Sequence, residues 1–303
     1  MNIRPIAFYL PQFHPIPEND SWWGKGFTEW TNVAKARPFF KSHYQPQLPA
    51  DLGFYDLRVP EVRRQQADLA RENGIFGFCY YHYWFNGRRI LERPFQETLE
   101  SGEPDFPFML CWANENWTRI WDGGEHNILL QQHYTEEDDR KHIRELIPVF
   151  KDKRYIRIKN KPVFCIYRSS LLPDAAKTLR IWREEARLAG LELYLCRVEN
   201  FGNQGADFMQ AGFDAAIEFQ PFMNTLDRFK KEVLGSRLKK DLMGRALLKY
   251  YHLTDPSKEE KFLRKRFSNI DFNEYVDFVL KVNRYPADYL RFPGVTPSWD
   301  NTA

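Results

Sequence analysis

Short apolar runs alternate with amphipathic segments along most of the chain. The apolar runs predict buried strands at Ile3–Leu10, Ile75–Trp84, Phe106–Ala113, Pro162–Tyr167, Leu191–Val198, Phe213–Phe219 and Tyr289–Phe292. Helical periodicity with cap and stop signals predicts helices at Val59–Asn73, Thr135–Phe150, Asp174–Ala189, Gln204–Ala211 and Asn273–Lys281. We expect a long aromatic loop from Pro11 to about Arg58, and a small hairpin that pairs Tyr155–Ile158 with the fourth run. Strands that are apolar on both faces and alternate with helices are typical of a parallel sheet.

Two architectures compete, an open doubly wound sheet and a closed barrel. The first strand exits through Pro11-Gln12-Phe13-His14-Pro15, which has no Gly-rich phosphate loop and disfavours a dinucleotide-binding sheet. Polar or aromatic side chains follow six successive strands: Tyr9 and Gln12; Tyr80, His82 and Trp84; Trp112, Asn114, Glu115 and Trp117; Tyr167 and Arg168; Arg197, Glu199 and Asn200; Glu218 and Gln220. In a barrel all such ends converge on one face, where active sites lie. An open sheet gathers only those near its switch point.

We therefore predict an α/β fold of the (β/α)8 TIM-barrel type. Seven strands are expected within the chain, with the eighth missing, in one domain over residues 1–303. A basic helical insertion is expected at about 223–270, where 13 Lys and Arg face 6 Asp and Glu. Its apolar residues recur every three to five positions, which predicts amphipathic helices with a cationic face. Two interpretations stay open: a solvated insertion packed on the barrel, or contact with an anionic membrane surface or an acidic glycan.

Aromatic content changes the picture, because 25 Phe, 15 Tyr and 9 Trp are more than a core of this size needs. Seven of the nine Trp precede residue 122, and each buried indole N–H requires a partner. Trp84, Trp112 and Trp117 stand beside amide and carboxylate residues, a composition that suits the apolar faces and hydroxyl rims of sugars. Core packing is the alternative. The net charge of +3 gives no polyelectrolyte character, so a nucleic-acid partner is not expected.

Other features exclude whole classes of protein. The longest nearly apolar run, Ile75–Phe85, is too short to span a membrane, and the N-terminus lacks a signal-peptide layout. The four cysteines lie inside apolar runs at Cys79, Cys111, Cys165 and Cys196, which is typical of small buried side chains rather than of disulfides. These features predict a cytoplasmic protein, with peripheral contact at the inner membrane as an option.

Three carboxylates are candidates for chemistry, because Glu115, Glu199 and Glu218 each follow an apolar strand. Glycoside chemistry uses one carboxyl group as acid and another as base or nucleophile. The alternative is that these residues pair with Arg119, Arg168 or Arg197 and hold loops. His14 and His82 have no metal-binding spacing, so no metal and no cofactor is expected, and hydrogen bonding to substrate is the preferred interpretation. No G-x-S-x-G elbow supports a serine hydrolase.

Five stretches resemble a known family. They are Ala7–His14, Gly26-Phe27-Thr28-Glu29-Trp30, Gly77–Phe85, Cys111-Trp112-Ala113-Asn114-Glu115-Asn116-Trp117, and the ending from Phe292-Pro293-Gly294-Val295 to Trp299-Asp300-Asn301. They closely resemble the WbsX-type family, glycosyltransferase-like proteins of lipopolysaccharide O-antigen clusters. That family is similar to glycoside hydrolase family 99, the endo-α-mannosidase and mannanase group. The resemblance spans essentially the whole chain and implies a (β/α)8 barrel and glycan chemistry without a metal.

The resemblance also implies where substrate is bound. By their positions in the matching motifs, Tyr9, Tyr80, His82, Trp84, Asn114, Glu115, Glu218 and Asp300 are expected to face substrate. To these we add Gln12, His14, Trp30, Trp112, Trp117, Arg168 and Trp299. In the family, a Trp-Asn-Glu-Trp-x-Glu-Gly stretch after the Trp-Asp-Asn segment carries the catalytic pair. One carboxylate assists through the sugar's own 2-hydroxyl and the other is the acid/base. The sequence reaches Ala303 before that stretch, so the pair is expected beyond Ala303, and Glu115, Glu199 and Glu218 remain the candidates within the chain.

The predicted function is retaining glycosidase or transglycosylase chemistry on a bacterial polysaccharide or a lipid-linked glycan. A nucleotide-sugar glycosyltransferase of O-antigen biosynthesis is the first alternative, although the D-x-D motif of many such enzymes does not occur. A non-catalytic glycan-binding protein is the second alternative. The sugar, its linkage and the oligomeric state stay open.

Overall fold

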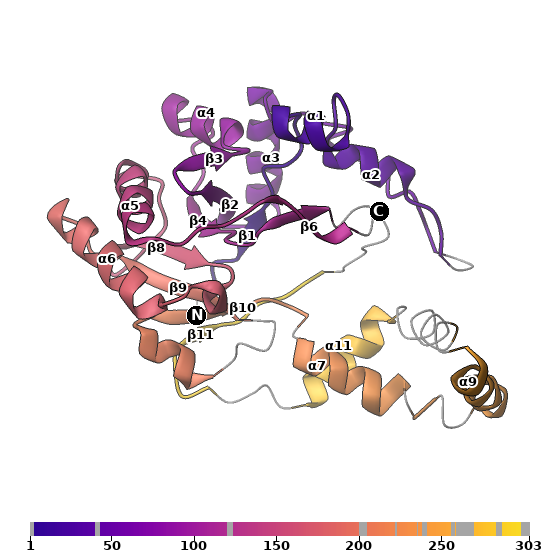
Figure 1. Ribbon diagram of the computed structural model, residues 1–303. Helices are drawn as coiled ribbons and strands as arrows, with labels where there is room; N and C mark the ends of the chain where they lie inside the picture. Colours follow the sequence, from indigo (N-terminus) through magenta and orange to yellow (C-terminus); the bar gives the residue numbers. More distant parts are fainter. Residues whose placement is uncertain are drawn as a thin grey trace. The chain divides into compact units, whose positions relative to one another are not determined.

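The computed structural model describes residues 3–39, 43–119, 124–199, 205–221, 223–234, 236–237, 241–255, 258, 270–282 and 287–297 (Figure 1). The strands are β1 Ile6–Tyr9, β2 Gly77–Phe85, β3 Arg88–Ile90, β4 Phe108–Trp112, β5 Trp117–Arg119, β6 Gly124–Leu130, β7 Arg157–Ile158, β8 Lys161–Ile166, β9 Tyr194–Glu199, β10 Ala215–Glu218 and β11 Arg291–Phe292. The α-helices are α1 Pro17–Trp23, α2 Glu29–Lys35, α3 Pro60–Glu72, α4 Arg93–Ser101, α5 Glu136–Phe150, α6 Ala175–Leu188, α7 Met223–Phe229, α9 Leu242–Thr254 and α11 Phe272–Lys281. Shorter helical turns are η2 Ser169–Leu171, η3 Ala206–Ala211 and the π-helical η4 Lys230–Leu234.

The chain forms two compact units. Unit 1 comprises Met1–Val198, Asp207–Ala216 and Asp300–Ala303, and unit 2 comprises Glu199–Ala206 and Ile217–Trp299. The basic segment at about 223–270 lies in unit 2, where α7, η4 and α9 confirm its helical character. That all residues belong to one domain remains a prediction.

The core of unit 1 is a curled, mostly parallel sheet. Its strand order is β1-β2-β4-β8-β9-β10. Neighbours from β1 to β9 pair in parallel, as in Ile6↔Gly77 and Phe78↔Phe108. Helices α3, α4, α5 and α6 lie along the outer side of this sheet (Figure 1). The predicted α/β fold with a barrel-type parallel sheet is thereby confirmed.

Several predicted elements match closely, because their local signals are strong. The side chain of Thr135 accepts a hydrogen bond from the backbone N–H of Asp138, and Asp174 does the same for Lys177, so both cap their helices as the sequence indicates. The predicted hairpin is the antiparallel pair β7–β8. All five residues of β4 and all six of β9 are buried, in keeping with strands covered on both faces.

The segment from Pro11 to about Arg58 was wrongly predicted as a loop, since it contains α1 and α2. Two further connections, for which no element was predicted, contain β3 and α4 after β2 and the hairpin β5–β6 after β4. These elements are short, of three to nine residues. Periodicity needs more residues than that to stand out from a polar and aromatic background.

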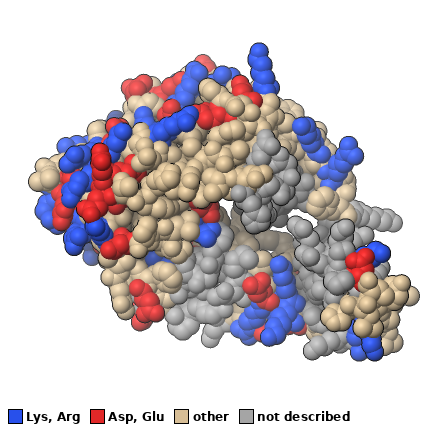
Figure 2. Space-filling model, in the orientation of Figure 1, with Lys and Arg blue, Asp and Glu red and all other residues tan. Residues whose placement is uncertain are grey.

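Charged side chains gather away from the sheet. On the face in Figure 2, Lys, Arg, Asp and Glu of both signs intermingle at the left margin, where α5 and α6 lie. Glu185 of α6 accepts hydrogen bonds from Arg140 and Arg144 of α5, each at 2.7 Å. In unit 2, α7 and α11 pack through Phe229 and Tyr275. Within the described residues, no helix is long and apolar enough to cross a membrane.

Candidate functional site

The two faces of β2 have different neighbours, since side chains alternate along a strand. Tyr81, Tyr83 and Phe85 lie on the inner face of the curled sheet. There Tyr81 contacts Phe8 at 5.5 Å between ring centroids, and Tyr83 and Phe85 contact Trp117 at 5.3 Å and 6.0 Å. The inner face therefore presents a row of aromatic side chains towards the carboxyl ends of the strands.

Tyr80, His82 and Trp84 lie on the opposite face, against the helices, which corrects their predicted contact with substrate. Trp84 is 1% exposed and donates its indole N–H to Asp138 of α5, with the nearer oxygen at 2.9 Å. The His82 ring lies against the ring of His142 of α5, with Nε2 to Nε2 at 3.0 Å. Tyr80 packs on Phe95 and Phe108. Buried rings that already pack against helices leave no surface for a sugar.

Two further predicted residues belong to this outer layer. Trp112 is 1% exposed, donates its N–H to the carbonyl of Trp84 and packs on Trp182 of α6. Tyr9 donates its hydroxyl to Gln66 of α3 at 2.5 Å. The predicted contact of Trp112 with substrate is corrected for the same reason, whereas Tyr9 is only partly buried and its contact with substrate stays a prediction.

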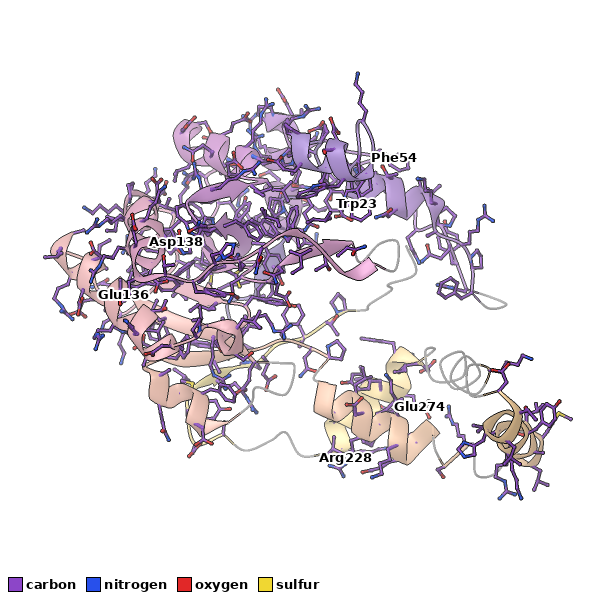
Figure 3. The ribbon with its side chains drawn as sticks, viewed as in Figure 1. Trp23, Phe54, Glu136, Asp138, Arg228 and Glu274 are labelled. Carbon is purple, nitrogen blue, oxygen red and sulfur yellow. The ribbon has the colours of Figure 1, made fainter. Side chains whose placement is uncertain are left out.

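A cavity of about 190 Å³ in unit 1 is the candidate site. It is lined by Gln12, Asn19, Trp23, Phe27, Glu29, Leu91, Asn116, Trp117, Thr118 and Leu129. Its residues come from the loop after β1, from α1 and α2, and from the β5–β6 hairpin; Trp23 is labelled in Figure 3. Gln12 donates its amide to the hydroxyl of Tyr83 at 2.7 Å, which ties the cavity to the inner face of β2. Of the predicted substrate residues, Gln12 and Trp117 line it.

The turn between α1 and α2 brings Phe27 and Glu29 to this cavity. Gly24 and Gly26 have φ values of +102° and +80°, a backbone conformation that residues other than glycine rarely adopt. The backbone N–H of Gly26 donates to the carboxylate of Asp20 at 2.8 Å. Thr28 then caps α2, so that Glu29 is its first residue. The Gly-x-Gly-Phe-Thr-Glu order thus has a local structural reason at each step.

Glu29 has an unusual environment for a carboxyl group. Burial raises its pKa to about 7, and no charged neighbour contributes to that shift. The shift corresponds to about 3 kcal/mol against the ionised form. A position in the first turn of a helix favours a negative charge by only about 0.3–1 kcal/mol, so desolvation dominates. The carboxyl group is therefore partly protonated near neutral pH.

A second polar group holds the loops after β4 and β8 together. Asn114 is fully buried; its amide donates to the carbonyl of Arg168 at 2.9 Å and accepts from the backbone N–H of the same residue at 2.8 Å. The Arg168 side chain donates to Glu115 at 2.5 Å. For Glu115, the structure thus shows the loop-holding arginine pair that was the alternative to a catalytic role.

His14 and Trp30 were also predicted to face substrate, and neither lines the cavity. His14 is buried, and burial lowers its pKa to about 4, so the ring is neutral at pH 7. Trp30 donates its N–H to the carbonyl of Tyr55 at 2.8 Å and packs on Phe13 and Phe54. Trp30 thereby helps to hold the segment that carries α1 and α2.

The other two candidate carboxylates meet in unit 2. Arg291 of β11 lies 3.4 Å from Glu199 and 3.1 Å from Glu218, and these side chains are 10%, 0% and 6% exposed. The hydroxyl of Tyr289 donates to Glu199, and the backbone N–H of Gly294 donates to Glu218. A Cβ on Gly294 would meet the carbonyl oxygen of Glu218 at 2.0 Å, so this close approach requires glycine. We call Glu199, Glu218, Tyr289 and Arg291 the unit 2 cluster.

Unit 2 also contains a cavity of about 360 Å³ beside this cluster. Glu218 and Arg291 form part of its polar wall, and α11 supplies an apolar wall that includes Val276 and Val279. The predicted residues Trp299 and Asp300 lie outside the described residues. Within the described part of the chain, no three His, Cys, Asp or Glu side chains come together as a metal site.

Comparison with known proteins identifies the family. Residues 5–303 match the family model described as glycosyltransferase WbsX. The chain belongs to the WbsX family. This is the family that the sequence motifs resemble.

Relatives of this WbsX-family chain extend beyond it. It is 41% identical over 302 residues to the uncharacterized protein WxcX of Xanthomonas campestris pv. campestris strain B100, and to that of strain ATCC 33913. The match covers 98% of this chain and 39% of WxcX, so the chain spans about two fifths of the length of these relatives.

Of two similar solved structures, the first supports the fold. One is a glycoside hydrolase-like protein, 15% identical, with a TM-score of 0.50 over 97% of this chain and 71% of that chain. Another is the GH99 endo-alpha-mannosidase of Bacteroides thetaiotaomicron, 14% identical, with a TM-score of 0.47 over 79% of this chain and 69% of that chain.

Sequence reasoning missed three residues of the WbsX-family chain that the geometry singles out. Tyr81 and Tyr83 were passed over in favour of their neighbours, because β2 is aromatic on both faces and the sequence does not say which face is inner. Glu29 was not among the candidate carboxylates, which were Glu115, Glu199 and Glu218. The available signal was its motif, since it stands between a capping Thr28 and Trp30 in a stretch that resembles the family.

Proposed function

We propose that this chain forms the sugar-binding part of a carbohydrate-active enzyme that acts on a bacterial polysaccharide or lipid-linked glycan. The observation that carries the proposal is the cavity of unit 1. Its rings, Trp23 and Trp117, can stack on the apolar face of a sugar, while Gln12, Asn19 and Asn116 can exchange hydrogen bonds with hydroxyl groups. At about 190 Å³ it is smaller than the roughly 300–1,000 Å³ of drug-sized sites, so it suits one sugar ring.

The chemistry that we propose is retaining glycosidase or transglycosylase chemistry. A glycosyltransferase of O-antigen biosynthesis and a non-catalytic glycan-binding protein are the alternatives. Incubation with mannose-containing glycans and, separately, with nucleotide sugars distinguishes them. Release or transfer of sugar from the glycan alone supports our proposal. A requirement for the nucleotide sugar supports a glycosyltransferase. Binding of the glycan without turnover supports a non-catalytic glycan-binding protein.

We expect Trp117→Ala to weaken glycan binding by on the order of tenfold, because a ring contact worth about 1.5 kcal/mol is lost. The measurement is titration calorimetry with a panel of disaccharides that includes α-mannobiose. Phe54→Ala is the control, because Phe54 is an exposed aromatic of the same unit that does not line the cavity (Figure 3). Equal affinity of the Trp117→Ala variant and the unaltered protein would contradict the assignment of this cavity.

We also propose that α9 contacts an anionic membrane surface, where a lipid-linked glycan would be found. Met243 and Leu253 of α9 are 76% and 74% exposed, and Arg245 and Lys249 lie on the same helix. An exposed apolar stripe beside cations is typical of helices that lie in a lipid interface.

The protein is expected to float with vesicles that contain phosphatidylserine and not with pure phosphatidylcholine vesicles, because each cation near an anionic surface contributes about 1 kcal/mol. Met243→Glu combined with Leu253→Glu should abolish flotation. Leu188→Glu, on exposed Leu188 of α6 in unit 1, is the control and should have no effect. Flotation that does not depend on the anionic lipid rules the proposal out.

A further inference from the structure

The cavity of unit 1 contains a carboxyl group and no cation. Glu29 lines it beside Trp117 and Asn116, and none of its lining residues in the described chain is Lys, Arg or His. By contrast, the three glutamates that follow apolar strands all pair with arginine side chains. Within the described residues, no hydrogen bond and no ion pair reaches the carboxyl group of Glu29. Because a desolvated carboxylate is stable only when it is paired, a bound cation would complete this cavity.

The other groups that line the cavity suit an organic ammonium group. Trp23 and Trp117 supply indole rings, which attract a cation that lies within about 6 Å of the ring centre. The amide of Asn19 and the hydroxyl of Thr118 supply uncharged oxygen acceptors. A hard metal ion such as Ca²⁺ would need about six to eight oxygen ligands, whereas an ammonium group needs one acceptor for each of its three N–H bonds. The cavity therefore matches an ammonium group better than a metal ion.

We propose that the cavity binds an amino sugar, whose ammonium group pairs with the carboxylate of Glu29. The inference rests on the proposed function of this cavity and names the class of sugar that it takes. Trp23 and Trp117 contact the apolar face of the sugar ring, and Glu29 distinguishes a free amine from a hydroxyl group or an N-acetyl group, which carry no charge. Glu29 is thus a specificity-determining residue and takes part in no bond-breaking step.

Release of a proton accompanies this pairing. Burial raises the pKa of Glu29 to about 7, so its carboxyl group is mostly protonated at pH 6 while the cavity is empty. A cation within hydrogen-bond distance favours the ionised form, so an ammonium sugar should displace that proton. None of the other lining residues, from α1, the loop after β1 or the β5–β6 hairpin, titrates. The hydroxyl of Tyr83 in β2 senses Glu29 but stays protonated, because burial raises its pKa as well.

The first experiment compares methyl α-mannoside with derivatives in which a single hydroxyl group, each in turn, is replaced by an amine or by an N-acetylamine. We expect one free amine to bind about tenfold or more tightly at pH 7 than both methyl α-mannoside and its own N-acetyl form. Calorimetry at pH 6, in two buffers of different ionisation enthalpy, should show proton release for that amine and none for its N-acetyl form.

The outcomes separate the inference from the proposed function. If methyl α-mannoside binds and no amine binds more tightly, the inference is wrong, while the sugar-binding function of the cavity stands. If no sugar of the series binds, the proposed function fails, and the inference with it. Tighter binding of an amine without proton release at pH 6 would also overturn the pairing with Glu29.

The second experiment assigns the preference to a residue. Glu29→Gln keeps the size of the side chain and removes its charge, so the amine should bind no more tightly than methyl α-mannoside, and no proton should be released. Affinity for methyl α-mannoside itself should change by less than about threefold, which excludes a general loss of structure. Glu145→Gln, at an exposed position of α5, is the matched control and should keep the preference. A preference for the amine that survives in Glu29→Gln would show that another group binds the cation.

Discussion

Replacing Arg291 by methionine is expected to destabilise unit 2 by about 3–5 kcal/mol, because the substitution removes the guanidinium group that two buried carboxylates share. Glu199 and Glu218 are 0% and 6% exposed, and both depend on the same guanidinium group. The hydroxyl of Tyr289 and the backbone N–H groups of Gly205 and Gly294 still donate to these carboxylates, but none of the three carries a charge. Methionine fills a similar volume without a charge, so the loss reports the charge rather than a cavity.

The cause is tested with an arginine–glutamate pair that differs in its burial. Arg237→Met is the matched control. Arg237 also pairs with a glutamate, Glu274 of α11, but both partners are partly exposed, and exposed pairs contribute about 0–1 kcal/mol.

Hydrogen exchange of the peptides that contain β11 and α11 measures this prediction for unit 2 alone. Protection should fall by two orders of magnitude or more in the Arg291→Met variant, since about 1.4 kcal/mol corresponds to a factor of ten. Protection in Arg237→Met should change by less than about tenfold. Similar protection in both variants would mean that the unit 2 cluster contributes no more than a surface pair.

The elements that could be predicted from the sequence are those with long periodic or capped signals. Helices α5 and α6 were predicted closely because Thr135 and Asp174 fix their starts. The parallel sheet followed from runs such as β4 that are apolar on both faces. The short helices α1 and α2 escaped notice, although they carry one wall of the candidate cavity, because seven residues hold too little periodicity.

The faces of the strands could not be predicted. In Tyr80-Tyr81-His82-Tyr83-Trp84, both the even-numbered and the odd-numbered positions are aromatic. Alternate positions point to opposite faces of the strand, so a shift of one residue would exchange the side chains on the inner face for those on the outer face. The sequence therefore led to Tyr80, His82 and Trp84, whose partners are His142 and Asp138 of α5. Which of these side chains face the helices is decided by tertiary packing and not by the local sequence.

The carboxylates show the same limit. That Glu115, Glu199 and Glu218 follow apolar strands was correct, but their arginine partners come from distant segments: Arg168 for the first and Arg291 for the other two. Glu29, by contrast, begins the short helix α2, and its motif does not indicate that the carboxyl group is desolvated. Burial of a single polar group depends on how three separate segments close a cavity.

Acid is expected to destabilise unit 1 through the buried pair of His82 and His142. Burial lowers the pKa of His82 to about 3, and burial together with the facing His82 ring lowers the pKa of His142 well below its usual value. Both rings are therefore neutral in the folded protein, whereas in the unfolded chain they take up protons below about pH 6.5. Their contribution to stability is present above that pH and is lost as the pH falls.

The expected loss from His82 alone is about 3 kcal/mol between pH 6.5 and about pH 4, and His142 adds to it. Asp139 acts in the opposite direction, because burial raises its pKa to about 6 and its folded form gains stability as it takes up a proton. A comparison between variants removes this opposing contribution.

The test variant is His82→Phe combined with His142→Phe, since position 142 is already surrounded by Trp84, Trp112 and Trp182 and can accept another ring. Urea unfolding from pH 7 to about pH 4 should show a stability that falls less in the double variant than in the unaltered protein, by about 3 kcal/mol or more. His133→Phe, at an exposed position, should keep the slope of the unaltered protein. If the double variant keeps that slope too, the pair is not the acid-sensitive element of unit 1.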